Sequence, residues 1–299
     1  MNIPEYRCRT VIPDEELTEK QGKIQTDEDY NLLATGPCRI LKPDGRPLLV
    51  YLPGAIPADL NAAVYPDLTK IRQRTDNRGL ASGSRRAKGV GQRTKALAVP
   101  SAIIGYYDGK ASPYHCRLTA YTARETAGWE RVQPLFRFIG QRFAEMVPER
   151  YQAQMEVVNR TGPDWVIPGT PFTTITVNNT YPTGVHTDKG DLDAGFSCLA
   201  VLRRGDYSGG ILTFPAFRVA VDMKDGDLIL MDAHEWHGNT ALVKHSPDAE
   251  RISVVCYYRT EMEKCDALPT EMAKAEAVAE WAAGFAAKPE FLAARGRKK

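Results

Sequence analysis

Residues 173–259 contain six short apolar runs, which carry the clearest signal for the fold. They are TTITVNN (173–179), GFSCLAVLR (195–203), GGILTF (209–214), RVAVDM (218–223), GDLILMD (226–232) and RISVVCYYR (251–259). Gly, Pro or Asp separates these runs at close intervals, which is typical of β-strands joined by turns. Too little sequence lies between them for connecting helices, so we expect an antiparallel sandwich or barrel rather than a parallel sheet.

Helical and hairpin patterns flank this strand-rich region. Residues 36–52 alternate in the manner of a short hairpin around a Pro-Asp-Gly turn. IPADLNAAVYPDLTKIRQR (56–74) and WERVQPLFRFIGQRFAEMV (129–147) repeat apolar residues at helical spacing, so each predicts a helix with one buried face. The Ala-rich residues 269–287 predict a further helix near the C-terminus.

Composition places the chain among ordinary globular proteins. Its 299 residues are 43% hydrophobic and 25% charged with a net charge of +2, which excludes a disordered, collagen-like or coiled-coil chain. No apolar stretch is long enough to span a bilayer, and the first residues, MNIPEYRCRTVIPDEE, lack an apolar signal core. We therefore expect no membrane partner and a cytoplasmic location.

The six cysteines are scattered, with no C-x-x-C pair and no spacing typical of a zinc site. They are Cys8, Cys38, Cys116, Cys198, Cys256 and Cys265. We interpret all six as reduced thiols, and Cys198 and Cys256, which lie in strand-like runs, as core residues.

A basic segment interrupts this nearly neutral chain. From Lys70 to Lys95 there are nine Lys or Arg residues against one acid, Asp76, with Gly and Ser interspersed. Such a local excess indicates contact with a polyanion, whereas a solvated charged loop gives the same pattern without a partner. Charge alone leaves both interpretations open.

Two short motifs in the strand-rich region carry unusual side chains. The first is VHTD (185–188), which follows a predicted strand, and the second is DAHEWHGN (232–239), which follows GDLILM. His186 and Asp188 point to the same side of extended backbone because side chains alternate along a strand. One more His from the second motif would complete a two-His, one-carboxylate triad, which leaves three cis positions of an octahedral iron open.

The order of these residues along the chain strengthens the interpretation. His237 follows His186 by 51 residues, and Arg251 stands 14 residues further on in a predicted strand. Enzymes that combine iron with 2-oxoglutarate need a fixed cation for the distal carboxylate of the acid, and Arg supplies a two-pronged donor. The spacing fits a double-stranded β-helix, or jelly roll, with the metal at its mouth.

The run from Val177 to Thr240, with RISVVCYYR after it, resembles the TET/JBP branch of the iron- and 2-oxoglutarate-dependent dioxygenases. The resemblance covers about residues 100–260, including the upstream motifs IIGYYDG (103–109) and CRLTAYT (116–122). Known members oxidise the 5-methyl group of thymine or 5-methylcytosine in DNA, and related sequences occur in bacteriophages, whose proteins act in the host cytoplasm. The resemblance implies Fe(II), 2-oxoglutarate and O2 as cofactors, ascorbate as a reductant in vitro, and DNA as the partner.

Together these patterns predict an α+β protein with a double-stranded β-helix core, N-terminal helices and a C-terminal helical tail. Residues 1–100 would form an N-terminal extension with the basic, DNA-contacting loop. Residues 101–262 would form the dioxygenase core with its supporting helix, and residues 263–299 a helical basic tail.

Carried over residue by residue, the resemblance implies His186, Asp188 and His237 as the iron ligands. His234 competes for the third position. We prefer His237 because HGNTAL followed by the R-I-S strand is the arrangement of the family. His234 would then be a neighbour of the ligands or a surface residue.

The same resemblance implies which residues bind 2-oxoglutarate. Arg251 would pair with it, and Ser253, two residues further along the strand, would add a hydroxyl donor on the same face. Arg78, within TDNRG (75–79), resembles an upstream arginine that also reaches 2-oxoglutarate in animal members. A phosphate contact or a plain surface position is the alternative for Arg78.

Base recognition is where the chain departs from the animal members. They carry Asn three residues after the ligand carboxylate and His eight residues after the 2-oxoglutarate arginine, whereas this chain has Asp191 and Arg259. Asp191 would accept from the cytosine amino group or the thymine N3 hydrogen, and Arg259 would donate to a ring nitrogen or a carbonyl. An ion pair between the two residues that shapes the pocket is the alternative.

DNA contacts follow from the position of the target methyl group. It lies in the major groove of a duplex, so the nucleotide must be flipped out to reach a buried iron. Tyr106 and Tyr107 align with an aromatic stretch near DNA in the family, and would stack on a base or fill the gap that the flipped nucleotide leaves in the duplex. The alternative is that both tyrosines are core residues of a strand. Arg85, Arg86 and Lys88, in the basic segment, would bind phosphates of the DNA backbone.

We therefore expect a monomeric enzyme that hydroxylates the C5-methyl group of 5-methylcytosine in DNA to 5-hydroxymethylcytosine. Thymine, giving 5-hydroxymethyluracil, is the alternative substrate, because neither Asp191 nor Arg259 separates the two bases. An oxygenase acting on a protein or a free small molecule is a rival among enzymes. A modified-base-binding module with a vestigial iron site is a rival from another class, against which the intact ligands and Arg251 argue.

Overall fold

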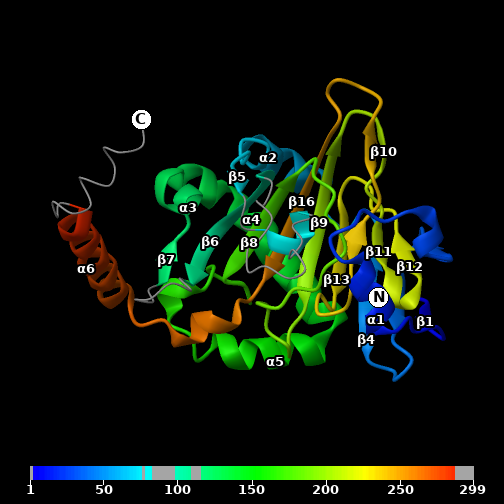
Figure 1. The fold of residues 1–299 in the computed structure, drawn as a ribbon, viewed down its shortest axis with the longest axis horizontal. Coiled ribbons are helices and arrows are strands. Elements are labelled where there is room, and N and C mark those ends of the chain that lie inside the picture. The colour runs from blue at the N-terminus through cyan, green and yellow to red at the C-terminus, as the bar shows by residue number, and fades with distance from the viewer. Residues whose placement is uncertain (1–2, 76–77, 83–97, 109–115, 287–299) are drawn as a thin grey trace, which may run out of the picture.

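The computed structural model describes residues 3–75, 78–82, 98–108 and 116–286. Two β-sheets pack face to face, and helices cover the outer face of the larger sheet (Figure 1). This is the α+β, double-stranded β-helix architecture that the strand-rich region predicts. None of the helices in these residues is both long enough and apolar enough to cross a membrane.

The larger sheet is built from ten strands of the described chain. They are β1 (Glu5–Arg7), β3 (Cys38–Leu41), β4 (Pro47–Leu52), β5 (Arg74–Thr75), β6 (Val99–Asp108), β7 (Cys116–Leu118), β8 (Thr174–Asn179), β9 (Ser197–Arg204), β13 (Asp227–Met231) and β16 (Glu250–Tyr257). Their order is β1-β3-β4-β13-β9-β16-β8-β6-β5, with β7 paired to β6. Except for the parallel pair β1–β3, neighbouring strands are antiparallel, as the short connections require.

The smaller sheet has the order β14-β11-β12-β2, and two further strands form a separate two-stranded antiparallel sheet. The strands of the smaller sheet are β2 (Leu32–Ala34), β11 (Leu212–Phe214), β12 (Val219–Val221) and β14 (Gly238–Asn239), and those of the two-stranded sheet are β10 (Tyr207–Gly209) and β15 (Leu242–Lys244). Apolar side chains fill the space between the two sheets, among them Val201 and Ile229 from the larger sheet and Phe214 and Val219 from the smaller. Burial of these faces holds the sandwich together.

The N-terminal residues belong to both sheets. The predicted hairpin of residues 36–52 forms as β3 and β4, and β4 pairs with β13 in the middle of the larger sheet. β2 pairs with β12 at the edge of the smaller sheet. A boundary at residue 100 therefore does not separate two sheets.

Six α-helices and five short 3-10 turns complete the described chain. The helices are α1 (Asp14–Lys20), α2 (Ala58–Leu68), α3 (Ala120–Arg124), α4 (Thr126–Met146), α5 (Pro148–Val158) and α6 (Leu268–Ala286), and the turns are Asp27–Asp29, Gly79–Ser82, Pro163–Trp165, Pro215–Phe217 and Thr260–Lys264. The predicted apolar stripe of α4, including Val132, Phe136 and Phe143, is fully buried against the larger sheet. α6 projects from the body at the end opposite the N-terminal strands (Figure 1).

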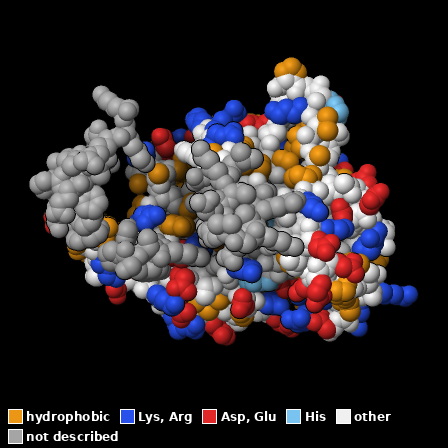
Figure 2. Space-filling model, viewed as in Figure 1, with side chains coloured by type: hydrophobic (Ala, Val, Ile, Leu, Met, Phe, Trp, Pro, Cys, Tyr) orange, Lys and Arg blue, Asp and Glu red, His pale blue; other side chains and the backbone are white. Residues whose placement is uncertain are grey.

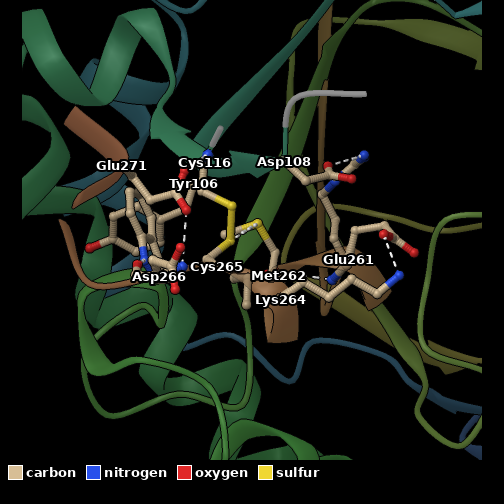
Figure 3. The surroundings of a disulfide bond; sticks show 12 residues. Tyr106, Asp108, Cys116, Glu261, Met262, Lys264, Cys265, Asp266 and Glu271 are labelled. Carbon is tan, nitrogen blue, oxygen red and sulfur yellow. Dashed lines mark hydrogen bonds and ion pairs between the residues drawn. A yellow bond between two sulfur atoms is a disulfide. The ribbon is translucent and has the colours of Figure 1, made fainter. Parts of the chain in front are cut away.

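The prediction of six reduced thiols is wrong for two of them. Cys116 and Cys265 form a disulfide that ties β7 to the chain just before α6 (Figure 3). The two cysteines are 149 residues apart, so no local spacing reveals the pair, which forms because the edge strand β7 meets the end of the Thr260–Lys264 turn. Cys198 and Cys256 are free and buried in the core, as expected.

Candidate active site

The two histidine-bearing motifs pair directly through their backbones. His186 N donates to His237 O at 2.9 Å, and His237 N donates to His186 O at 3.0 Å. Asp188 N donates to the carbonyl of Ala233 at 3.0 Å, which holds the first motif along the second. As a result, one ligand atom from each of His186, Asp188 and His237 lies within 4.8 Å of the others, an arrangement that could hold a metal ion.

Backbone carbonyls orient both imidazole rings. Nδ1 of His186 donates to the Gly184 carbonyl at 2.8 Å, and Nδ1 of His237 donates to the Glu235 carbonyl at 2.9 Å. Each Nε2 therefore turns a lone pair toward the Asp188 carboxylate, at 3.5 and 3.7 Å. Burial lowers the pKa of both histidines, that of His237 to about 4, so both rings are neutral at pH 7. Three electron-pair donors that converge in this way repel one another unless a cation lies between them, so the set fits a divalent metal ion.

His234 lies outside this cluster and has other partners. Its Nδ1 is 3.2 Å from Asp232 Oδ1, and its Nε2 is 3.0 Å from Asp193 Oδ1. The Asp232 carboxylate raises the pKa of His234 to about 9, so at neutral pH both ring nitrogens carry hydrogen. A protonated ring has no lone pair to offer a metal.

Arg251 and Ser253 are buried on the same face of β16, opposite to Ile252 and Val254, which pack in the helix-covered core. The Arg251 residue is 4% exposed, and its Nη2 has no hydrogen-bond partner in the described chain. Burial lowers the pKa of Arg251, which reflects the cost of a charge held away from water. An anionic ligand at this place would remove that cost, as the carboxylate of 2-oxoglutarate would.

Arg78 approaches the same region from the N-terminal segment. The carbonyl of Ala81 accepts from Gly184 N at 2.9 Å and from the Tyr181 hydroxyl at 2.7 Å, which ties residues 78–82 to the loop that carries His186. Burial is the main cause that lowers the pKa of His186, and the positive charge of Arg78 lowers it further. Nε of Arg78 is buried without a hydrogen-bond partner among the described residues, so Arg78 brings a second positive charge and one unused donor to this region.

Arg259 does not form the ion pair with Asp191 that the alternative interpretation expects. Within the described chain its partner is Asp108, the last residue of β6, which is 1% exposed. The guanidinium also lies 4.7 Å from the centroid of the Tyr107 ring, and Arg117 lies 5.0 Å from the same ring. The pair Asp108–Arg259 joins residues 151 positions apart, so only the pairing of β6 in the sheet brings them together.

Asp191 pairs with Arg259 through the backbone, in an isolated β-bridge, and the Arg259 charge also acts on the Asp191 carboxyl without forming an ion pair. Its Oδ2 accepts from the Ser197 hydroxyl at 2.5 Å. Burial, followed by the nearby charge of Asp188, raises the pKa of Asp191 to about 7. A raised pKa favours the neutral form of this carboxyl, which is able to donate as well as accept a hydrogen bond.

The two neighbouring tyrosines of β6 point to opposite faces. Tyr106 packs edge-on against Trp129 and Trp165, with ring centroids 6.5 and 5.9 Å apart, which is a core position. Tyr107 lines a cavity of about 330 Å³ together with Arg78. Of the two rings, that of Tyr107 is therefore the one placed beside a space that a ligand could enter.

The expected phosphate-binding residues Arg85, Arg86 and Lys88 lie outside the described residues. Figure 2 shows other Lys and Arg side chains gathered along the upper edge of the face in view, over α2 and β5. Arg72 and Arg74 are exposed in this part of the chain.

Two further residues at the site carry no sequence signal of their own. Asp108 lies within the motif IIGYYDG, but no neighbouring sequence feature identifies Arg259 as the partner of Asp108. Tyr207 lies in a polar turn, RRGDYSGG, yet it is 3% exposed and its hydroxyl has no hydrogen-bond partner in the described structure.

A double-stranded β-helix that brings two histidines and one carboxylate together is the arrangement of non-haem iron oxygenases. The Tet_JBP family model, described as the oxygenase domain of the 2OGFeDO superfamily, matches residues 102–260. The chain belongs to this family. Membership implies Fe(II) and 2-oxoglutarate as cofactors, together with O2. The converging donors fit them, and so do the buried nitrogens Arg251 Nη2 and Arg78 Nε, which have no hydrogen-bond partner among the described residues.

Curated relatives resemble part of the chain. It is 38% identical over 167 residues to thymine dioxygenase JBP1 of Leishmania braziliensis, a match covering 54% of this chain and 20% of that protein. It is 34% identical over 218 residues to thymine dioxygenase JBP1-A of Trypanosoma cruzi (strain CL Brener), covering 71% and 24%. The chain thus spans no more than about a quarter of the length of these relatives.

A solved structure, described as NgTET1 in complex with 5mC DNA, is similar over most of the chain. The TM-score is 0.59 and the identity 15%, and the match covers 89% of this chain and 99% of that one. At this identity the likeness shows the fold alone, which agrees with the sandwich described above.

Proposed function

We propose that this protein is a DNA 5-methylpyrimidine dioxygenase whose iron(II) is held by His186, Asp188 and His237. When bound, the cofactors supply the oxidation itself: O2 and 2-oxoglutarate are consumed, succinate and CO2 leave, and an oxygen atom enters a C–H bond. The observation that carries the proposal is the convergence of three electron-pair donors near two buried and unpaired arginine nitrogens, Arg251 Nη2 and Arg78 Nε.

The chain's own residues bind and orient the co-substrate. Arg251 pairs with the distal carboxylate of 2-oxoglutarate, and Ser253 adds a hydroxyl donor from the same face of β16. Arg78 supplies a second positive charge from the N-terminal segment. Burial of these groups excludes water, which strengthens each interaction.

The proposed target is 5-methylcytosine. Ser197 donates to Oδ2 of Asp191, and Oδ1, for which the described residues show no donor, would accept from the N4 amino group of cytosine. The ionised carboxyl accepts from N4, and the protonated carboxyl also donates to N3, so both forms present at a pKa of about 7 fit cytosine. Thymine fits only the protonated form well, because its O4 repels an ionised carboxylate.

Thymine is the second candidate, and the relatives favour it. Proteins named thymine dioxygenases align with more than half of this chain at 34–38% identity. The product would then be 5-hydroxymethyluracil. The base pocket itself, with Asp191 able to change protonation, does not exclude this substrate.

DNA would reach the site with the target nucleotide flipped out of the duplex, because the metal ligands are largely buried. Tyr107 is the residue of the predicted aromatic pair that we expect to contact bases, since Tyr106 packs against tryptophans. Arg85, Arg86 and Lys88 would contact phosphates. All of these groups come from one chain, so a monomer suffices.

The test uses the full chain with iron(II), 2-oxoglutarate and ascorbate. Matched duplexes containing either 5-methylcytosine or thymine at one position are incubated, digested to nucleosides and measured by mass spectrometry. We expect 5-hydroxymethylcytosine with an equal amount of succinate. A larger yield of 5-hydroxymethyluracil would make thymine the target. Succinate without any oxidised nucleoside would contradict a DNA base as substrate.

A further inference from the structure

A second buried donor accompanies Arg251. Tyr207, on β10, is 3% exposed, and its hydroxyl has no hydrogen-bond partner among the described residues. Nη2 of Arg251 has the same two properties. Burial lowers the pKa of Arg251, and the Tyr207 hydroxyl lies close enough to the guanidinium to raise it, but two donors cannot supply an acceptor to each other's remaining hydrogens. Buried polar groups are nearly always hydrogen-bonded in folded proteins, so buried donors without an acceptor are costly. The place therefore suits a ligand that offers acceptor atoms.

Several observations place Tyr207 and Arg251 side by side. Arg251 stands directly opposite Arg203 in the register of β16 and β9. The Arg203 guanidinium lies 3.8 Å from the centroid of the Tyr207 ring. Gly210, on the same turn as Tyr207, lies against Arg251, because a Cβ at Gly210 would stand 3.5 Å from Arg251 Cδ. Burial raises the pKa of Tyr207, and Arg251 acts in the opposite direction, as a close cation does.

The ligand for this place is an anion. Two arginines opposite each other on neighbouring strands repel, so Arg203 and Arg251 together favour a negative group between the sheets. Asp222 contributes its charge to both Arg251 and Tyr207, but its carboxylate is paired with Lys224 at 2.6 Å. Arg203 also donates to the Tyr207 carbonyl at 2.5 Å, which holds the tyrosine in position.

We propose that Tyr207 donates its hydroxyl hydrogen to the distal carboxylate of 2-oxoglutarate beside Arg251, and that Arg203 positions the Tyr207 ring. This inference rests on the proposed function, which places 2-oxoglutarate at Arg251. The two donors contact the two oxygens of one carboxylate. Tyr207 thereby favours a dicarboxylic 2-oxo acid, since a monocarboxylic one leaves both donors unpaired.

The decisive variant is Tyr207→Phe, which keeps the ring and its stacking with Arg203 and removes only the hydroxyl. Binding of 2-oxoglutarate is measured by calorimetry on the full chain loaded with Mn(II) in place of iron, so that no turnover intervenes. We expect the dissociation constant to rise about tenfold, the effect of losing one hydrogen bond to a charged group. In turnover the KM for 2-oxoglutarate should rise in proportion while kcat stays unchanged.

Stability separates ligand binding from a structural role. The hydrogen of the Tyr207 hydroxyl has no acceptor in the described structure, and the contact of its oxygen with Arg251 is weak, so ligand-free Tyr207→Phe should unfold at about the same temperature as the wild type. Tyr51→Phe is the matched control, because the Tyr51 hydroxyl is equally buried but donates to Asp227 at 2.6 Å. Tyr51→Phe should lower the unfolding temperature and leave 2-oxoglutarate binding unchanged.

A second probe, 2-oxopentanoate, lacks the distal carboxylate. Wild type and Tyr207→Phe should bind it equally. The inference is overturned if Tyr207→Phe binds 2-oxoglutarate as tightly as the wild type, or if its affinity for both probes falls by the same factor. A wild-type protein that fails to bind 2-oxoglutarate would instead overturn the proposed function.

Discussion

The metal corner (His186, Asp188 and His237) and the base corner (Asp108, Asp191, Tyr107 and Arg259) are close enough for the charges of Asp188 and Asp191 to interact, yet they are built differently. In the metal corner, two short motifs pair through their own backbones, and each motif shows its ligands in the sequence. In the base corner, Arg259 depends on Asp108 from a distant strand. Alternation along one strand therefore reveals metal ligands in the sequence, whereas a long-range ion pair depends on the order of strands in the sheet.

The largest effect is expected in the metal corner. His186→Ala, Asp188→Ala and His237→Ala should each reduce metal binding and take succinate formation below detection, because two donors remain where three are needed. His234→Gln is the control and should retain activity, since His234 is engaged by acids. Metal content and succinate release measure both. Activity retained by His237→Ala but lost by His234→Gln would reverse the assignment.

Next in size is the loss of the guanidinium fork at Arg251. Arg251→Lys keeps the charge but loses the paired donors, so the KM for 2-oxoglutarate should rise about 10- to 150-fold, equivalent to about 1.5 to 3 kcal/mol. Ser253→Ala should raise it less. Steady-state kinetics at saturating DNA measure the effect. An unchanged KM in Arg251→Lys would remove Arg251 from co-substrate binding.

A substitution in the base corner should change the KM for DNA without changing the KM for 2-oxoglutarate. Asp108→Asn keeps the shape but removes the charge that holds Arg259, so we expect the KM for DNA to rise about tenfold and the KM for 2-oxoglutarate to stay constant. Asp67→Asn is the matched control, because buried Asp67 binds Arg131 at 2.7 Å between α2 and α4. That variant should lose stability without a change in either KM. Identical behaviour of the two variants would mean that Asp108 is only structural.

A smaller effect is expected outside both corners, in the basic segment. Replacing Arg85, Arg86 and Lys88 together by Ala should weaken DNA binding for all sequences. The slope of log affinity against log salt should flatten by about 0.9 for each phosphate that the variant no longer neutralises. Titrations at several salt concentrations measure this slope. Binding that is unchanged at two of them would show that the segment is solvated charge.

The smallest effect concerns the choice of base. Asp191→Asn turns the carboxyl into an amide that both donates and accepts, so preference should shift toward thymine by about fivefold, close to 1 kcal/mol. Metal binding should not change. Competition between the two matched duplexes measures the ratio. A ratio equal to that of the wild type would exclude Asp191 from base recognition.

Periodic patterns predicted most of the fold. The six apolar runs of residues 173–259 form β8, β9, β11, β12, β13 and β16, and the stripe Val132, Phe136 and Phe143 is the buried face of α4. These predictions succeeded because a strand or helix with one buried face repeats apolar residues at its own period, whatever its neighbours are. The neighbours themselves were not predictable, so the sequence did not reveal that β4, from the N-terminal segment, lies beside β13.

Sequence patterns alone identified the kind of protein and singled out His186, Asp188 and His237, because closely spaced side chains on extended backbone have a defined direction. Three other pairings depend on the tertiary fold. These are the Cys116–Cys265 disulfide, the Asp108–Arg259 ion pair and the placement of Tyr207 beside Arg251. Each joins groups 44 to 151 residues apart in the chain. These contacts depend on which strands pair in the sheets, and the periodicity within one strand carries no information about its partner strand.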